Sequence, residues 1–456
     1  MYIKQQNFLI VGVSKSGISA AEYVLKQGGK LYFYEEIVND LTKNTKDKLI
    51  ELGGICVEKE SVESIIDQID ILVVSPGVPI NHKVCVLAKE KQKRIIGEFE
   101  FGFMLFQPTV VGVTGTNGKT TTVHLIESVI KNAKQKVQLV GNMGVAITSV
   151  IDNIDKNTFC VAEVSSFQLE TTNVFCPHIS CVLNISPDHL ERHYTMENYI
   201  FLKKKIFANQ KESEFSILNY DDLTVRSFAE QTKAKVIFVS TKQKIDGAYL
   251  KDGYLFFKEV PIIEQKQLAL EGEHNLYNCL FCIAVCRLLG INIDIIAQSL
   301  KEFKGVPHRI QLIREFNGVK FYNDSKSTNT SSTMVAINAM KGETILILGG
   351  SEKGENYANL FQKIKQSAIK HIVITGASRF NMIEEAIKRN VLNFTITPNF
   401  NVAVKVASLL ASEGDNVLLS PACASFDEFE NYAERGKVFK KLIVLKGVNE
   451  QSKDGK

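Results

Sequence analysis

Short apolar runs alternate along this chain with longer segments in which apolar residues recur every three or four positions. The short runs are rich in Val, Ile and Leu and predict buried strands, which fall at residues 8–13, 31–35, 71–74, 109–113, 159–163, 181–185, 320–324, 344–348 and 417–419. The longer segments have the spacing of helices, for example after residue 119 and from 273 to 289. Strands that alternate with helices in this way predict an α/β fold with mostly parallel sheets.

The chain has 456 residues, which is too many for one hydrophobic core, so we expect three domains. The pattern predicts a Rossmann-like domain over residues 1–97, a central P-loop mononucleotide-binding domain over 98–305 and a second Rossmann-like domain over 306–448. The polar tail, residues 449–456, is expected to be disordered. Short strands and turns between residues 213 and 267, with a hairpin signal at Asp252 and Gly253, predict a peripheral β excursion from the central domain.

The strongest chemical motif is a glycine-rich loop between the predicted strand 109–113 and the helix that follows, with the sequence Thr114-Gly115-Thr116-Asn117-Gly118-Lys119-Thr120-Thr121. Gly115 and Gly118 permit a close backbone approach, so that N–H groups at the helix N-terminus can converge on phosphate oxygens. Lys119 adds a mobile positive charge, and the hydroxyl of Thr120 suits Mg²⁺. The general P-loop pattern has glycine at position 113, where this chain has Val113, so the loop is a variant.

Polar residues follow two later strands of the predicted central domain. Glu163 ends one strand, and Asp188 and His189 come shortly after the next. A carboxylate at such a strand end suits a metal–phosphate site, because Mg²⁺ is held by one or two carboxylates together with phosphate oxygens. A lone residue of this kind is more often structural, but two of them beside one P-loop predict a site.

The N-terminal domain begins with a turn that partly matches a dinucleotide-binding loop. Gly12 and Gly17 flank Ser14, which occupies the place of the second glycine, and Glu35 ends the next strand. Ser75 opens the loop after another apolar strand. This pattern favours a nucleotide-like ligand over an intact dinucleotide site, and a purely structural glycine turn is the alternative.

Composition narrows the class of protein. The net charge of +4 is spread over the whole chain, without the Lys/Arg cluster expected of a nucleic-acid surface. Nine cysteines, an odd number set mostly in apolar runs, indicate reduced thiols and a cytoplasmic protein. Cys279 and Cys282 form a C-x-x-C pair, but Cys286 continues the same helical stripe, so core packing is favoured over a zinc site. No apolar run is long enough to span a membrane.

Further ordered motifs extend over almost the whole chain. They are Gly141-Asn142-Met143-Gly144, Glu163-Val164-Ser165-Ser166-Phe167-Gln168-Leu169-Glu170, Asp188-His189, His274-Asn275, Pro307-His308-Arg309, Asp324-Ser325-Lys326-Ser327-Thr328-Asn329 and Ser420-Pro421-Ala422-Cys423-Ala424-Ser425-Phe426-Asp427. Together with the P-loop variant, they resemble the Mur ligases of peptidoglycan synthesis. The last two motifs are similar to the members that add D-glutamate. The alternatives are another Mur-type ligase, whose diamino-acid-adding members carry an Asp-Asn-Pro-Arg stretch that is absent here, and a folylpolyglutamate-type ligase, which lacks these C-terminal motifs.

The resemblance implies an ATP-dependent amide ligase that works through an acyl phosphate. Its substrates would be UDP-N-acetylmuramoyl-L-alanine and D-glutamate, and its cofactor Mg²⁺ at two sites. The amine's general base has no assignment, and we expect a monomer.

The resemblance also implies roles for individual residues. ATP would be held by Gly115, Thr116, Asn117, Gly118, Lys119, Thr120, Thr121, Asn275, Arg309 and Asp324. The first Mg²⁺ would bind Thr120 and Glu163, and the second would bind His189. The substrates would contact Ser14, Lys15, Glu35, Ser75, Asn142, Thr328, Lys353, Ser425, Phe426 and Tyr432. The residues implied in catalysis are Lys119, His189, Lys203 and Lys326.

Lys203 matches the lysine that this family carbamylates. Addition of CO₂ would turn a cation into an anion able to bind Mg²⁺, and the amine must be neutral to react. Lys204 is the alternative, because the loop before this lysine is one residue shorter in this chain than in the family pattern. From the residues alone, Lys203, Lys204 and Lys205 are at least as well explained as a solvated basic face.

Two other functional classes make different predictions. A P-loop switch or motor would hydrolyse ATP without an amine substrate. An oxidoreductase would need an intact dinucleotide site, which Ser14 argues against. The P-loop with its strand-end carboxylate favours the ligase over both.

Overall fold

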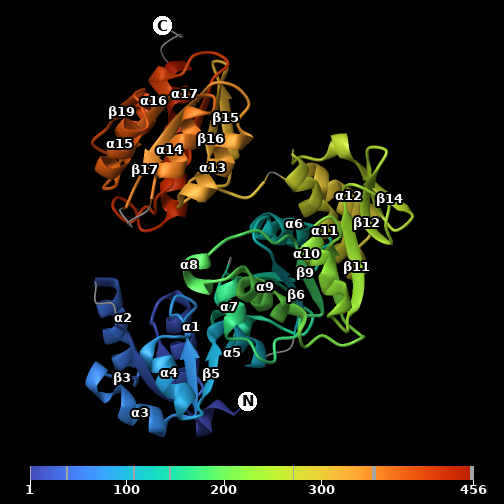
Figure 1. The fold of residues 1–456 in the computed structure, drawn as a ribbon, viewed down its shortest axis with the longest axis vertical. Coiled ribbons are helices and arrows are strands. Elements are labelled where there is room, and N and C mark those ends of the chain that lie inside the picture. Colours follow the sequence, from blue (N-terminus) through green and yellow to red (C-terminus); the bar gives the residue numbers. More distant parts are fainter. Residues whose placement is uncertain are drawn as a thin grey trace. The chain divides into compact units, whose positions relative to one another are not determined.

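The structure, a computed structural model, describes residues 2–36, 40–105, 108–142, 145–270, 272–303, 305–351 and 356–451. These residues form three sheets, and the chain divides into two compact units, Met1–Phe303 and Lys304–Lys456 (Figure 1). The first unit holds two of the sheets and the second unit holds the third. The α/β class and the three sheet-based domains predicted from the sequence are confirmed.

The N-terminal sheet is fully parallel, with the strand order β3-β2-β1-β4-β5. Its strands are β1 (Asn7–Val11), β2 (Lys30–Tyr34), β3 (Ile55–Cys56), β4 (Ile71–Val74) and β5 (Arg94–Gly97). Helices α1 (Lys15–Lys26) and α2 (Asp40–Glu51) cover one face, and α3 (Val62–Gln68) and α4 (Lys83–Glu90) cover the other. The strands are buried on both faces, so successive apolar residues of one strand pack alternately into two separate cores.

The central sheet has the strand order β14-β13-β12-β11-β10-β9-β6-β8-β7. Its strands are β6 (Thr109–Thr114), β7 (Val137–Gly141), β8 (Phe159–Glu163), β9 (Ile179–Val182), β10 (Phe215–Asn219), β11 (Lys235–Ser240), β12 (Gly247–Lys251), β13 (Tyr254–Phe257) and β14 (Val260–Glu264). The predicted hairpin at Asp252 and Gly253 is present. The predicted excursion is an extension of the same sheet, because β10 pairs in parallel with β9, β11 with β10 and β12 with β11. Only the β12–β13 and β13–β14 pairs are antiparallel.

Helices also cover the central sheet. On one face, α6 (Lys119–Asn132) packs against α11 (Glu273–Leu288) and α12 (Ile293–Glu302). Residues of α7 (Ser166–Glu170) and α10 (Leu223–Arg226) enter the core of the other face, where α9 (Met196–Lys204) packs against α7. A short helix, α8 (Leu190–His193), precedes α9.

Helix α5 (Glu98–Leu105) contributes to one core of the N-terminal domain and to one core of the central domain. The Phe101 ring packs against Phe8 of the N-terminal sheet, and the Phe99 ring packs against Phe175 of the central domain. Glu98, fully buried, accepts hydrogen bonds from the backbone N–H and the hydroxyl of Thr148, and burial raises its pKa. The predicted boundary at residue 97 therefore lies at the end of β5, just before a helix that both domains share.

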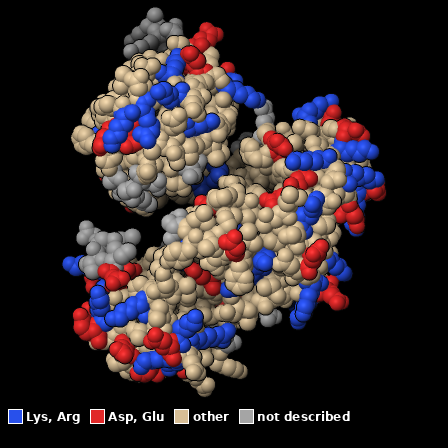
Figure 2. Space-filling view, viewed as in Figure 1, with Lys and Arg blue, Asp and Glu red and all other residues tan. Residues whose placement is uncertain are grey.

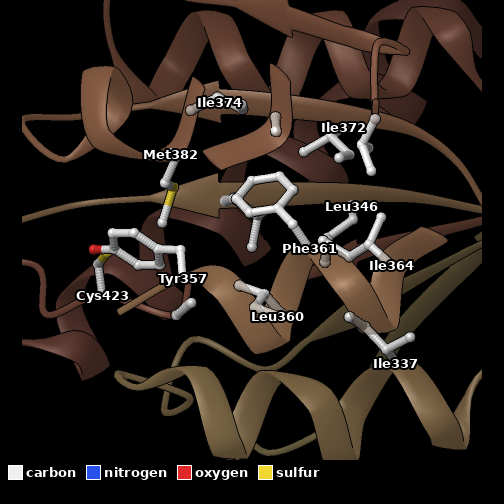
Figure 3. Close-up of a cluster of buried hydrophobic side chains, with 14 of the residues drawn as sticks. Ile337, Leu346, Tyr357, Leu360, Phe361, Ile364, Ile372, Ile374, Met382 and Cys423 are labelled. Atoms are coloured by element: carbon white, nitrogen blue, oxygen red, sulfur yellow. The ribbon is translucent and has the colours of Figure 1, made fainter. Parts of the chain in front are cut away.

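The C-terminal sheet has the strand order β15-β16-β20-β17-β18-β19, and only the β15–β16 pair is antiparallel. Its strands are β15 (Gln311–Phe316), β16 (Val319–Asn323), β17 (Thr344–Gly349), β18 (Ile369–Thr375), β19 (Phe394–Ile396) and β20 (Asn416–Leu419). One core contains residues of α13 (Thr330–Ala339), α14 (Ala358–Lys365) and α15 (Arg379–Lys388), with Phe361 and Met382 at its centre (Figure 3). The other contains residues of α16 (Phe400–Leu410) and α17 (Tyr432–Gln451).

The end of the chain differs from the prediction. Residues 449–456 were expected to be a disordered tail, but α17 continues through Gln451. The polar composition of residues 449–451 does not end the helix, because it contains no proline or glycine. Residues 452–456 lie outside the described residues.

All nine cysteines carry free thiols. Cys279, Cys282 and Cys286 are buried on α11, as expected for core packing. Among the described residues, no helix is both long and apolar enough to cross a membrane. On the face drawn in Figure 2, basic and acidic side chains are interspersed.

Candidate active site

The glycine-rich loop lies between β6 and α6, in the strand–loop–helix order that the sequence predicts. Gly118 has a left-handed backbone (φ 87°), and a Cβ there would lie 2.5 Å from Oδ1 of Asn278 on α11. Gly115 has φ 149°, and a Cβ there would lie 2.9 Å from Cβ of Leu183. Both positions therefore need glycine for conformation and for space. The backbone N–H groups of the loop lie at the N-terminus of α6, and N–H groups in this position bind phosphate.

Residues from the strand beside the loop fix its shape. Asn184, after β9, accepts a hydrogen bond from the N–H of Asn117 (2.8 Å) and donates one to the carbonyl oxygen of the same residue (3.1 Å). Its own carbonyl accepts from the N–H of Thr116 (2.9 Å). The hydroxyl of Thr116 lies 3.1 Å from that of Tyr199 on α9. The loop is therefore held by two elements that are distant in sequence.

Lys119 and Lys203 both direct their amines at the loop. The Lys119 ammonium donates to the carbonyl oxygens of Gly115 (2.8 Å) and Thr116 (2.9 Å). The Lys203 amine donates to the carbonyl of Gly115 (2.9 Å) and lies over the ring of Tyr199. Lys203 is only 1% exposed. Burial, and then the charge of Lys119, lower the pKa of Lys203 well below the usual value.

Lys204 points to different neighbours. Its amine donates to Oε1 of Gln231 (2.9 Å) and lies over the ring of Phe228. Of the two lysines that the sequence left open, only Lys203 contacts the glycine-rich loop.

Glu163 lies at the end of β8, directly opposite Val113 of β6 in the sheet register. Its Oε1 accepts a hydrogen bond from the side-chain amide of Asn142 (2.7 Å). Its Oε2 is buried and has no hydrogen-bond partner among the described residues. An unpartnered buried carboxylate oxygen is costly unless a cation or donor binds it, so this oxygen fits a magnesium ligand.

Within the ranges given above, no group of three or more His, Cys, Asp and Glu side chains is arranged to hold a metal ion. Glu163 would therefore need phosphate or hydroxyl oxygens, such as that of Thr120, to complete a magnesium site. Thr120 is buried in the first turn of α6.

The loop after β9 carries His189, which has a left-handed backbone (φ 53°). Its Nε2 lies 3.5 Å from Oδ2 of Asp188, and its ring packs on Phe167. About half of each of the two polar side chains is exposed, so this pair is open to a ligand.

Arg192 links this loop to the N-terminal domain. Its guanidinium donates to the carbonyl oxygens of Pro76 (2.9 Å) and Val78 (3.3 Å), in the loop after β4. It also pairs with Glu170 (2.7 Å) and stacks over the ring of Phe167. The loop that begins at Ser75 is thereby attached to the segment that carries His189.

Three of the predicted substrate residues meet at the carboxyl ends of β1, β2 and β4. Ser75 donates its hydroxyl hydrogen to the carbonyl of Gly12 (2.5 Å), and Glu35 accepts from the N–H of Val13 (2.8 Å). Ser14 is exposed and immediately precedes α1. The side chain of Lys15 lies outside the described part of the chain.

In the second unit, Asp324 follows β16 and is 1% exposed. It accepts hydrogen bonds from the hydroxyl of Ser420 (2.7 Å) and the N–H of Ile310 (3.1 Å). Burial raises the pKa of Asp324 to about 6, although hydrogen bonds from Ser327 and Ser420 and the nearby Arg309 act to lower it.

This raised pKa predicts a pH-dependent stability. The contribution of protonated Asp324 to the stability of the fold is fully present below pH 4. It is lost as the pH rises through about 6, because the folded state then contains a buried anion. A shift of about two pKa units corresponds to roughly 3 kcal/mol, so Asp324→Asn should raise the free energy of unfolding by up to that amount at pH 8. At pH 4 the variant should match the parent. Urea unfolding followed by circular dichroism at both values tests this, and equal destabilisation at both would contradict it.

The remaining predicted residues of the second unit lie on two loops. Lys326 and Thr328 follow β16, and Ser425 and Phe426 lie between β20 and α17, which begins at Tyr432. The Ser425 hydroxyl is buried without a hydrogen-bond partner among the described residues. Lys353, like Met143 and Gly144 of the Asn142 motif, lies outside the described residues.

Of the predicted nucleotide and metal residues of the first unit, Lys119 and Thr120 lie at the start of α6, Glu163 lies opposite Val113, and Lys203 contacts the glycine-rich loop, whereas His189 contacts Asp188 and Phe167. Asn275 lies in the first turn of α11 and accepts a hydrogen bond from Asn278, which lies against Gly118. The contributions of Asn184, Tyr199 and Arg192 were not expected from the sequence. Only the position of Asn184, just after a strand beside the loop, could have indicated its role.

Family models match the chain in three consecutive segments. A Mur ligase MurD-like N-terminal domain matches residues 6–97, a Mur ligase middle domain matches 113–286, and a Mur ligase glutamate ligase domain matches 308–423.

Curated relatives match almost the whole chain. The UDP-N-acetylmuramoylalanine–D-glutamate ligase of Thermoanaerobacter sp. (strain X514) is 39% identical over 451 residues, covering 97% of this chain and 99% of the relative. The enzyme of the same name from Clostridioides difficile (strain 630) is 38% identical over 455 residues, covering 96% and 98%.

Solved structures share the architecture. The UDP-N-acetylmuramate-alanine ligase MurC of Thermotoga maritima matches with a TM-score of 0.58 at 16% identity, over 96% of this chain and 99% of that one. The MurF ligase of the same organism, in complex with ADP, matches with a TM-score of 0.56 at 18% identity, over 98% and 100%. At these identities the likeness concerns the fold.

Proposed function

This chain belongs to the Mur ligase family and, within it, to the UDP-N-acetylmuramoylalanine–D-glutamate ligases, and from this premise we propose that it joins D-glutamate to UDP-N-acetylmuramoyl-L-alanine at the expense of ATP. The observation in the structure that supports this most is the meeting of Lys119, Lys203 and the unpartnered oxygen of Glu163 at the glycine-rich loop. It supplies positive charge and a metal ligand where several anionic groups must react.

In this reaction the alanyl carboxylate attacks the γ-phosphorus of ATP, and the bond to the β–γ bridging oxygen breaks to release ADP. The amine of D-glutamate then attacks the acyl carbon. The tetrahedral adduct loses phosphate and the amine loses a proton, leaving an amide. Positioning and neutralisation of charge carry most of this catalysis.

We assign residues 1–97 to the UDP moiety, through Ser14, Lys15, Glu35 and Ser75. Residues 98–305 would bind ATP, with Asn142 and His189 near the acceptor carboxylate. Residues 306–448 would bind D-glutamate. There Lys326, Thr328, Lys353, Ser425, Phe426 and Tyr432 are the proposed contacts. We also assign Arg309 and Asp324 to ATP, as the family resemblance implies. We also propose that the enzyme acts as a monomer in the cytoplasm, a reducing compartment that suits its nine free thiols.

Thr120 and Glu163 would hold one Mg²⁺, and His189 with a carbamate on Lys203 would hold a second. Bound magnesium would neutralise phosphate charge in the reacting complex. The carbamate forms when the neutral Lys203 amine attacks the carbon of CO₂ and loses a proton. Burial and the lowered pKa of Lys203 support this proposal, because they favour the neutral amine.

Glu163→Gln should weaken the binding of Mg²⁺. The fold should not change, because glutamine has the shape of glutamate and its side-chain oxygen can still accept a hydrogen bond from Asn142. Since losing a supporting residue typically costs 10- to 100-fold in metal affinity, losing a ligand should raise the half-activating Mg²⁺ concentration by at least about tenfold. The matched control is Glu197→Gln, at an exposed acid in the first turn of α9. An unchanged Mg²⁺ dependence in the Glu163 variant would remove this residue from the metal site.

The proposed function is tested by phosphate release from ATP with UDP-N-acetylmuramoyl-L-alanine and one amino acid at a time. Release that requires D-glutamate supports it. Release with L-lysine or meso-diaminopimelate in place of D-glutamate would overturn it, and so would equal release without the sugar nucleotide.

A further inference from the structure

Arg435 on α17 is among the most deeply buried charged side chains of the second unit. It is 2% exposed, and all its hydrogen bonds go to neutral groups. Its Nε donates to the hydroxyl of Ser325 (3.0 Å), and Nη2 donates to the carbonyl oxygens of Ser325 (2.9 Å) and Cys423 (3.0 Å). Its Nη1 donates to the carbonyl of Ala424 (3.2 Å). One guanidinium therefore joins the loop after β16 to the loop after β20.

A third loop joins the same point. The carbonyl of Ala424 also accepts from the N–H of Ser351 (2.9 Å), in the loop after β17. A Cβ on Gly350 of that loop would lie 3.0 Å from Nη1 of Arg435. Strands β16, β20 and β17 are neighbours in the sheet, so the three loops leave its carboxyl edge side by side. Ligands of open α/β sheets bind at this edge.

The residues held by Arg435 immediately precede those proposed to bind the amino acid. Ser325 precedes Lys326, and Ala424 precedes Ser425, whose hydroxyl is buried and unpartnered among the described residues. A shift in either carbonyl would displace the next side chain in the sequence.

The charge of Arg435 is only partly balanced by neighbouring acids. Among the residues that the structure describes, it forms no ion pair. The carboxylates of Asp427 and Glu428 are near enough for their charges to oppose the effect of burial, although their hydrogen bonds come from the N–H groups of Ala377 and Phe400. Burial accordingly lowers the pKa of Arg435 to about 10, so the group stays charged at neutral pH. A buried cation without a directly paired carboxylate is costly in free energy and is commonly associated with a functional site.

We propose that Arg435 is a positioning residue for the acidic amino acid: its guanidinium fixes the loops that carry Lys326 and Ser425, and its buried charge favours a dicarboxylate over a monocarboxylate. This inference rests on the proposed function, because it takes D-glutamate as the amino-acid substrate. It does not make Arg435 a direct ligand, since every one of its observed bonds is to the protein.

The test compares Arg435→Met, which removes charge and hydrogen bonds, with Arg435→Lys, which keeps only the charge. Arg435→Met should raise the KM for D-glutamate by about tenfold or more, since a buried hydrogen-bonded charge is lost. It should also lower the preference for D-glutamate over D-glutamine. Arg435→Lys should restore that preference but only part of the KM, because an ammonium cannot span three carbonyls. The KM values for ATP and the sugar nucleotide should stay within about twofold.

Lys437→Met, an exposed cation on the same helix, is the matched control and should behave as the parent. If the arginine variants do not fold, Ser325→Ala decides. It removes one acceptor of Arg435 and should raise the KM for D-glutamate by about threefold.

An unchanged KM for D-glutamate in a folded Arg435 variant, or in Ser325→Ala when the arginine variants do not fold, would overturn the inference. An equal rise of all three KM values would do the same. If the parent itself makes no product with D-glutamate, the proposed function fails, and that result is distinct from any difference between variants.

Discussion

Lys203→Met is expected to reduce ligation about 1,000-fold, comparable to the loss of a charge-stabilising group from an active site. The side chain is buried against the glycine-rich loop, where the carbamate proposed for it would add a metal ligand. Methionine keeps the length of the side chain but cannot react with CO₂. Stability should not fall, because the variant no longer buries an amine. Steady-state phosphate release and thermal unfolding measure the two effects.

Lys204→Met is the matched control, one residue along the same helix. Its amine bonds to Gln231 on the surface, so activity should stay within about twofold of the parent. Carbon-13 NMR in labelled bicarbonate should show a carbamate signal in the parent and in Lys204→Met, and none in Lys203→Met. Full activity of Lys203→Met, or a parent with no dependence on CO₂, would contradict the carbamate proposal.

Lys119→Met should lower kcat/KM for ATP roughly 100- to 1,000-fold, because a positive charge beside the transferred phosphate is lost. The same change removes two hydrogen bonds to the carbonyls of Gly115 and Thr116, worth about 1 kcal/mol each. A small fall in stability should therefore accompany a large fall in activity. Initial rates at varied ATP, together with thermal unfolding, separate the two.

Lys131→Met provides the comparison for Lys119. Lys131 lies on the same helix, α6, and forms an exposed pair with Glu127, which is worth little. This variant should keep the activity and stability of the parent. If Lys119→Met also kept full ligation, the glycine-rich loop would not be the ATP site.

Local signals predicted the fold well because they are repeated along the chain. The glycine-rich loop was located from its strand, its two glycines and its helix, all within about 25 residues. Strand β9 is a partial exception. The apolar run predicted a strand at 181–185, but the structure starts it at Ile179, because buried Ser180 bonds to Gln210 and Ser216 and so fits the core.

The groups that shape the site were harder to find, because their partners are distant in sequence. Asn184 forms hydrogen bonds with Asn117, which is 67 residues away in the sequence, and Arg435 forms hydrogen bonds with Ser325, which is 110 residues away. A single arginine on a helix is usually solvated, so nothing near position 435 indicates burial. Lys203 could be singled out only through a family resemblance; its burial and lowered pKa come from contacts with the loop and with Tyr199.

Helix α5 determines how this protein can be cut into working pieces. Phe101 packs into a core of the N-terminal domain, and Phe99 packs into a core of the central domain. A fragment that ends at residue 97 would therefore expose part of its hydrophobic core and would be prone to aggregate. A better place to divide the chain is near residue 304, because Met1–Phe303 and Lys304–Lys456 are separate compact units. Fragments 1–303 and 304–456 are therefore the pair to express apart and recombine in complementation assays.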